Sequence, residues 1–175
     1  RLGGVERVNG SQKFLADYDI AGMTHLKLVT LDVGRAKIKK IDASKALAVP
    51  GVIDVITAAD LPQPVPRFGP DRQDRPVIAV GETKFHGEPV AAVVAETKDI
   101  AAYAAGLVGV DFDTLPALTS TQDALAPGAP LVQDPTLRPG DRLAETNVLK
   151  DLNYSWGDVD QAKADLVIEN TYTFP

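Results

Sequence analysis

The chain has 175 residues, enough for one compact domain with a tail, and 45% of them are hydrophobic and 24% charged, as in globular proteins with a buried core. The net charge of −6 disfavours nucleic acid and anionic membranes as partners, because both attract concentrated Lys and Arg. The absence of cysteine excludes a disulfide scaffold, a cysteine nucleophile and a Cys-ligated iron–sulfur cluster in this chain. There is no signal peptide and no apolar run near the ~20 residues that span a bilayer, so we expect a cytoplasmic protein without a membrane partner. The only methionine is Met23, and we therefore expect the natural protein to begin upstream of residue 1.

After an extended lead-in over residues 1–19, partial alternation predicts a half-buried strand over 23–31, with Leu26 and Leu28 on one face and His25 and Lys27 on the other. Residues 32–34 can turn this strand into a second one over 36–41, whose basic run we interpret as a solvated face. Asp42 is a good N-cap for a short helix over 44–49. The β-branched run at 52–57 predicts the next strand.

Residues 60–76 contain five prolines, which exclude this stretch from a central sheet and from a helix. Loops of this length are usually functional or disordered. Short strands are expected over 77–80 and 84–86. The uninterrupted apolar run 90–95 predicts a strand covered on both faces.

Thr97 is expected to cap a helix through about residue 108, followed by a strand beginning at Val110 and a short helix capped by Thr119 or Ser120. The tail after Pro127 is irregular, with a short helix capped by Asp158 and a last strand over 166–173. The fold class is therefore α+β, with mixed sheets and two to three short helices. The predicted boundaries are a domain over 1–126 and an extended segment over 127–175.

No catalytic constellation emerges from the residues themselves. The two histidines, His25 and His86, lie far apart without a second ligand at metal-binding spacing, so no metal site is expected, and a metal hydrolase built on them is a remote alternative. No serine lies in a nucleophile elbow, and no phosphate-binding glycine loop is present. Gly87, Glu88 and Pro89 precede the apolar strand. The favoured interpretation is a structural turn. The weaker interpretation is that Glu88 acts in acid–base catalysis.

The order of short motifs resembles the large subunits of the xanthine dehydrogenase/aldehyde oxidase family. The stretches that carry the resemblance lie in order along nearly the whole chain, at residues 7–10, 16–20, 36–42, 50–62, 75–79, 85–97, 110–118 and 157–165. The segment from Phe85 to Thr97 is the most specific of them. Phe112 stands where tyrosine is usual, and His86 where a small or apolar residue is commoner.

The resemblance implies the α/β-hammerhead domain that precedes the molybdopterin-binding domains of these oxidoreductases. In the family, a molybdenum–molybdopterin cofactor hydroxylates aldehydes, purines or N-heteroaromatics, or oxidises carbon monoxide. Electrons then pass to [2Fe–2S] clusters and FAD on other domains or subunits, which are the expected partners. The family's catalytic glutamate and cofactor-holding loops lie beyond residue 175, so no catalytic residue and no cofactor are expected within this chain.

One functional site is expected within this chain, the loop over 63–74. By resemblance, Phe68 would line the substrate funnel, with Arg67 and Arg72 as weaker candidates, while burial of Phe68 in the domain's own core is the competing interpretation. The alternative function is a stand-alone binding or scaffold protein that uses the same fold.

Overall fold

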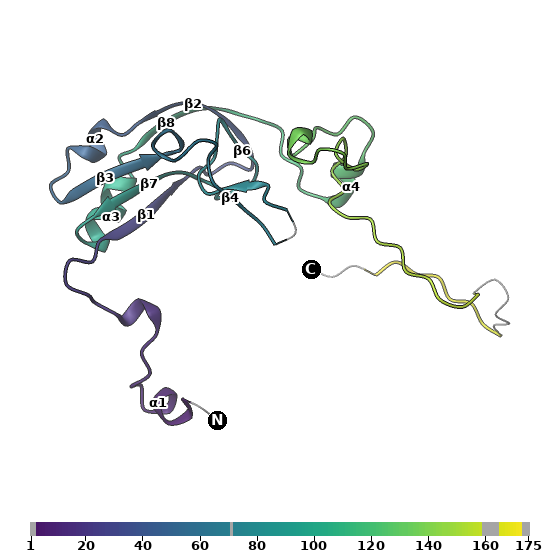
Figure 1. Cartoon of the computed structure of the whole chain (residues 1–175), viewed down its shortest axis with the longest axis horizontal. Helices are drawn as coiled ribbons and strands as arrows, with labels where there is room; N and C mark the ends of the chain where they lie inside the picture. The colour runs from purple at the N-terminus through teal and green to yellow at the C-terminus, as the bar shows by residue number, and fades with distance from the viewer. Residues whose placement is uncertain (1–2, 71, 159–164, 173–175) are drawn as a thin grey trace.

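The computed structural model describes residues 3–70, 72–158 and 165–172, and two three-stranded antiparallel sheets form its body (Figure 1). The first sheet has the order β1–β7–β3 and contains His25–Thr30, Pro89–Ala95 and Val52–Thr57. The second has the order β6–β2–β8 and contains Glu82–Thr83, Ala36–Asp42 and Gly109–Thr114. Along the chain, the strands of these sheets alternate between the first and the second, so the two sheets are interleaved.

The predicted apolar strand is the central strand of the first sheet. In β7, Val90 and Val93 are fully buried and Val94 is partly buried, because β1 and β3 flank the strand and α3 (Lys98–Ala105) packs on it. The Thr97 hydroxyl accepts a hydrogen bond from the backbone N–H of Ile100 at 3.2 Å and caps α3. The predicted strand and the start of the helix are confirmed, but the strand is less completely covered than predicted on the face of Val94.

Strand β1 is half-buried as predicted, but on the face opposite to its leucines. Leu26 and Leu28 share a face and are 57% and 46% exposed, whereas Val29, on the face of His25 and Lys27, belongs to the buried core. The reason is the position of α3, which lies against this second face of the sheet together with Val93.

The prediction that 32–34 turns β1 into a hairpin with β2 is wrong. Strand β1 pairs with β7, and β2 pairs with β8 and β6 in the other sheet. The backbone N–H of Ala36 donates to the Thr83 hydroxyl at 2.9 Å, which ties the start of β2 to β6. The following helix, α2 (Ser44–Leu47), is shorter than predicted, and Asp42 accepts the N–H of Ser44 at 3.0 Å from one position before the N-cap.

The strands predicted over 77–80 and 84–86 are displaced. The structure has β4 (Arg67–Phe68) paired with β5 (Arg75–Pro76), and then β6. Lys84 does not continue β6, because its backbone N–H donates to the Glu88 carboxylate at 2.5 Å instead of to a neighbouring strand.

Outside the sheets, the lead-in contains α1 (Gly4–Val8) and η1 (Leu15–Asp17) rather than only extended chain, and η2 (Ala58–Asp60) follows β3. Helix α4 (Thr121–Leu125) is capped by Ser120 as predicted, and η3 (Pro135–Leu137) interrupts the irregular segment after it. Residues 166–172 form no strand. The helix predicted after Asp158 falls on 159–164, outside the described residues, as does residue 173 at the end of the predicted strand. The α+β class is confirmed.

The described part of the chain contains no helix long and apolar enough to cross a membrane.

Candidate functional site

The proline-rich loop between β3 and β6 forms a small hairpin of its own, β4–β5, that projects from the sheets (Figure 1). Its backbone folds tightly at Gly69, where a Cβ atom would overlap the carbonyl oxygen of Arg72, so only glycine fits this position. The Arg67 guanidinium donates to the carbonyl of Asp74 at 2.8 Å and closes the hairpin from within.

The hairpin is tied to the C-terminal segment by a shared carboxylate. Arg72 forms an ion pair with Asp141 at 2.5 Å, and Arg138 donates to the same Oδ2 atom at 3.2 Å. The backbone N–H of Leu143, together with Arg138 and Arg72, lowers the pKa of Asp141 below its ordinary value. Arg138 is only 5% exposed. It also donates to the backbone carbonyls of residues 146, 148 and 149 and so holds the two ends of this segment together.

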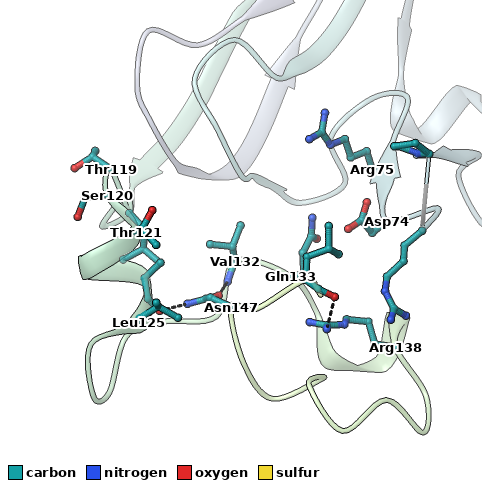
Figure 2. A pocket seen from close by; sticks show the side chains of 15 residues that line it. Asp74, Arg75, Thr119, Ser120, Thr121, Leu125, Val132, Gln133, Arg138 and Asn147 are labelled. Carbon is teal, nitrogen blue, oxygen red and sulfur yellow. Dashed lines mark hydrogen bonds between the residues drawn. The ribbon is translucent and has the colours of Figure 1, made fainter. Parts of the chain in front are cut away.

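Between the hairpin and the segment around α4 lies a cleft of about 590 Å³ (Figure 2). Asp74 and Arg75 line it from the hairpin, and Leu125, Val132 and Asn147 from the opposite side. The Asn147 amide donates to the carbonyl of residue 124 at 3.0 Å and accepts the N–H of Val132 at 3.0 Å, so it fixes this opposite wall. The volume is in the range of small-molecule sites.

A smaller cavity of about 260 Å³ lies beside the turn at residues 84–88. Glu88 is among the residues that line it and is only 2% exposed. Burial raises the pKa of Glu88 above its ordinary value, although the N–H of Lys84 and the charges of Lys84 and Arg75 oppose the rise. For the neighbouring Glu82, burial acts in the same direction, but hydrogen bonds from Arg35 and Lys84 outweigh it and lower the pKa.

The structure separates the predicted funnel residues. Phe68 is 53% exposed and lines neither cavity, so it does not cover the domain's own core. Arg67 lines the smaller cavity and Arg72 the larger one.

At the predicted turn, Gly87 has a positive φ of 83°, and Pro89 begins β7. The carboxylate of Glu88 accepts the N–H of Lys84 across this turn. Sequence reasoning missed the contribution of Arg138 and Asp141. Their spacing of three residues in a Pro- and Gly-rich stretch gave no periodic signal.

The two histidines do not meet. The Nε2 atom of His86 lies 3.0 Å from Asp32 Oδ1 on the surface, and His25 begins β1. Among the described residues there is no group of three His, Cys, Asp or Glu side chains placed to hold a metal ion.

Comparison with known proteins identifies this architecture. Residues 9–116, more than half of the chain, match the model of the family described as aldehyde oxidase and xanthine dehydrogenase, a/b hammerhead domain. The chain is 31% identical to a probable xanthine dehydrogenase subunit of Bacillus subtilis (strain 168) over its whole length, which is 22% of that protein. It is 28% identical to the nicotinate dehydrogenase large molybdopterin subunit of Eubacterium barkeri, covering 99% of this chain and 39% of the relative.

Solved structures agree with the sequence comparison. Carbon monoxide dehydrogenase from Oligotropha carboxidovorans superimposes with a TM-score of 0.69 and 37% identity, over 75% of this chain and 16% of that one. Aldehyde oxidoreductase from Desulfovibrio gigas gives a TM-score of 0.67 and 33% identity, over 80% of this chain and 16% of that one. The chain thus spans about a fifth to two fifths of the length of these curated relatives and about a sixth of these solved chains. It belongs to the aldehyde oxidase and xanthine dehydrogenase family, and it contains the family's α/β-hammerhead domain.

Proposed function

We propose that this chain is the N-terminal, non-catalytic domain of the large subunit of a molybdenum hydroxylase. In this role it packs on the molybdopterin-binding domain of the same subunit. The observation that carries the proposal is the match of the whole chain to only 22% of a xanthine dehydrogenase subunit that is 31% identical. The cytoplasm is the proposed location.

The chemistry of the residues supports a non-catalytic role. The sequence has no cysteine to ligate an iron–sulfur cluster, and the described side chains form no cation-binding group of three. The sequence therefore offers no thiolate ligand for the family's iron–sulfur clusters. The proposal assigns molybdenum to the remainder of the subunit, and [2Fe–2S] clusters and FAD to further domains or subunits.

The hairpin β4–β5 is proposed to border the substrate funnel of the assembled enzyme. Phe68 presents a half-exposed aromatic ring on a hairpin whose backbone is fixed by Arg67, and Arg72 ties this hairpin to Asp141. An apolar group held in this way can contact a flat substrate without a large cost of ordering.

The proposal is tested on the natural gene product that contains this sequence. Mass spectrometry should give a chain several times larger than 18.6 kDa, and metal analysis should give stoichiometric molybdenum in the purified enzyme. Oxidation of an aldehyde, a purine, an N-heteroaromatic compound or carbon monoxide would then assign the substrate class. A stable natural product of 18.6 kDa without molybdenum would instead support the stand-alone binding or scaffold protein.

A further inference from the structure

Strand β1 carries apolar side chains on a face of the first sheet that the described residues cover only in part. Leu26 lies opposite Val94 of β7, and Leu28 opposite Ala92, so their side chains share one face of the first sheet. On the next strand, Ile56 lies opposite Ala92 and continues this row. We call Leu26, Leu28, Ile56 and Val94 the β1 face, and the exposed Asp54, opposite Val94 on β3, borders it. Leu26 and Leu28 are about half exposed, and Ile56 and Val94 are partly buried.

Strand β2 of the second sheet differs from β1, because its exposed side chains are polar. Strand β2 exposes Lys37, Lys39 and Lys40, and Lys39 forms a 2.5 Å ion pair with Asp113 of β8. Polar residues outside and apolar residues inside are the usual arrangement of a half-covered sheet. Strand β1 reverses it, because its leucines face outward. Contiguous exposed apolar side chains of this kind mark interaction sites.

The backbone of β1 is also open along one side. Among the described residues its only strand neighbour is β7, so its outer edge offers N–H and C=O groups to a further strand. Figure 1 shows α3 on the first sheet and the residues before β1 leading away from the body. Helix α3 packs on the opposite face of the sheet from the two leucines.

We propose that the β1 face is a docking surface for the remainder of the same polypeptide, which covers its leucines with an apolar strand or helix. This inference rests on the proposed function, because it takes the molybdopterin-binding part of the large subunit as the occupant. The length of the relatives supports it, since this chain covers 22% of the Bacillus subtilis protein and most of such a chain lies outside the structure.

The test uses the full-length protein and a pair of single cysteine substitutions. Leu28→Cys reports on the β1 face, and Leu47→Cys on α2 is the matched control, because the two leucines are 46% and 50% exposed in this domain. Thiol labelling is followed by peptide mapping, which the absence of native cysteines in this region makes unambiguous. We expect Leu28→Cys to be labelled at least about tenfold more slowly than Leu47→Cys, because a covered thiol reacts only in the fraction of molecules in which the face is open. Equal labelling rates would overturn the proposal.

A second measurement identifies the occupant. The Leu26→Lys/Leu28→Lys double variant should release the domain to limited proteolysis in the full-length protein, whereas Leu47→Lys should behave like the parent. Slow labelling that disappears on dilution would identify a second copy as the occupant and would overturn the proposal. Labelling needs no cofactor, so a full-length protein without molybdenum would refute the proposed function while the β1 face is still measured directly.

Discussion

Arg72 and Asp141 are 69 positions apart, and their side chains meet at 2.5 Å, which joins the proline-rich hairpin to a segment without regular structure. The same carboxylate also holds the buried Arg138. One acidic side chain thus connects two parts of the chain that share no sheet. The relative position of the hairpin and the wall of the larger cleft depends on it.

Substitutions in this cluster should differ in their effect on stability. Arg72 is about one-third exposed, so Arg72→Ala should lower the free energy of unfolding by no more than about 1 kcal/mol. Arg138→Met should cost more, because three carbonyls and Asp141 lose their buried donor. Urea unfolding gives the comparison. Arg142→Ala, which removes an exposed ion pair with Asp151, is the control that should leave stability unchanged.

The core of the first sheet should not tolerate a charge. Val93 is fully buried, and Val93→Asp places an unpaired carboxylate there at a cost of several kcal/mol, of the order of the whole stability of a domain. We expect loss of the cooperative thermal transition. Leu26→Asp, on the exposed face of β1, is the matched control and should retain it in the isolated chain. A melting temperature of Val93→Asp within a few degrees of the parent would contradict the assigned packing.

Phe68→Ala tests the proposed funnel in the full-length enzyme. Because Phe68 is half exposed, its truncation should leave the melting temperature unchanged. A contribution to substrate access should alter KM or substrate preference in steady-state kinetics. Unchanged kinetics together with a lowered melting temperature would assign the ring a purely structural contact.

Glu88 should make stability depend on pH. Burial raises its folded-state pKa above the ordinary 4.5, so its contribution to stability is complete below that value and is lost as the pH rises through the folded-state pKa. Glu88→Gln mimics the protonated carboxyl and can still accept the N–H of Lys84. The variant should therefore gain stability relative to the parent as the pH rises from the ordinary pKa of 4.5 through the raised folded-state pKa of Glu88. A stability difference that does not change with pH in urea unfolding would exclude this role.

The chain purified alone should contain no molybdenum and should oxidise neither aldehydes nor purines. The reason is the proposed function, which assigns the molybdenum cofactor to the remainder of the large subunit, the part of the relatives that this chain does not cover. Metal analysis by mass spectrometry checks the first point, and a dye-reduction assay the second. Stoichiometric molybdenum in the isolated chain would refute the proposal that the remainder of the subunit holds the cofactor.

The elements that the sequence predicted well are those with a strong local signal. An uninterrupted apolar run placed β7, the β-branched run over 52–57 placed β3, and Thr97 placed the start of α3. The buried face of β1 could not be predicted, because alternation shows only that Leu26 and Leu28 share a face. Which face is covered depends on α3, about 70 residues later in the chain.

The candidate site was less predictable for the same reason. The resemblance predicted a site in the hairpin. The contact of Arg72 with Asp141 could not be predicted, because the sequence around these two residues has no periodic pattern. The displacement of β6 has a similar origin. The Glu88 carboxylate accepts a hydrogen bond from the N–H of Lys84, and strand propensity alone cannot predict this side-chain to backbone contact.

The alternation of strands between the two sheets has a consequence for folding. The first sheet is complete only when β7 has joined β1 and β3, and the second only when β8, the last strand, has paired with β2. No contiguous stretch short of residues 25–114 contains every strand of both sheets, so neither half of the domain forms a self-sufficient nucleus. The domain should fold as one all-or-none unit, and slowly for its size, because most of its pairings join distant parts of the chain. During synthesis, β1 must therefore wait until residues 89–95 have been made before it gains its strand partner, and its leucines stay exposed for all of that time.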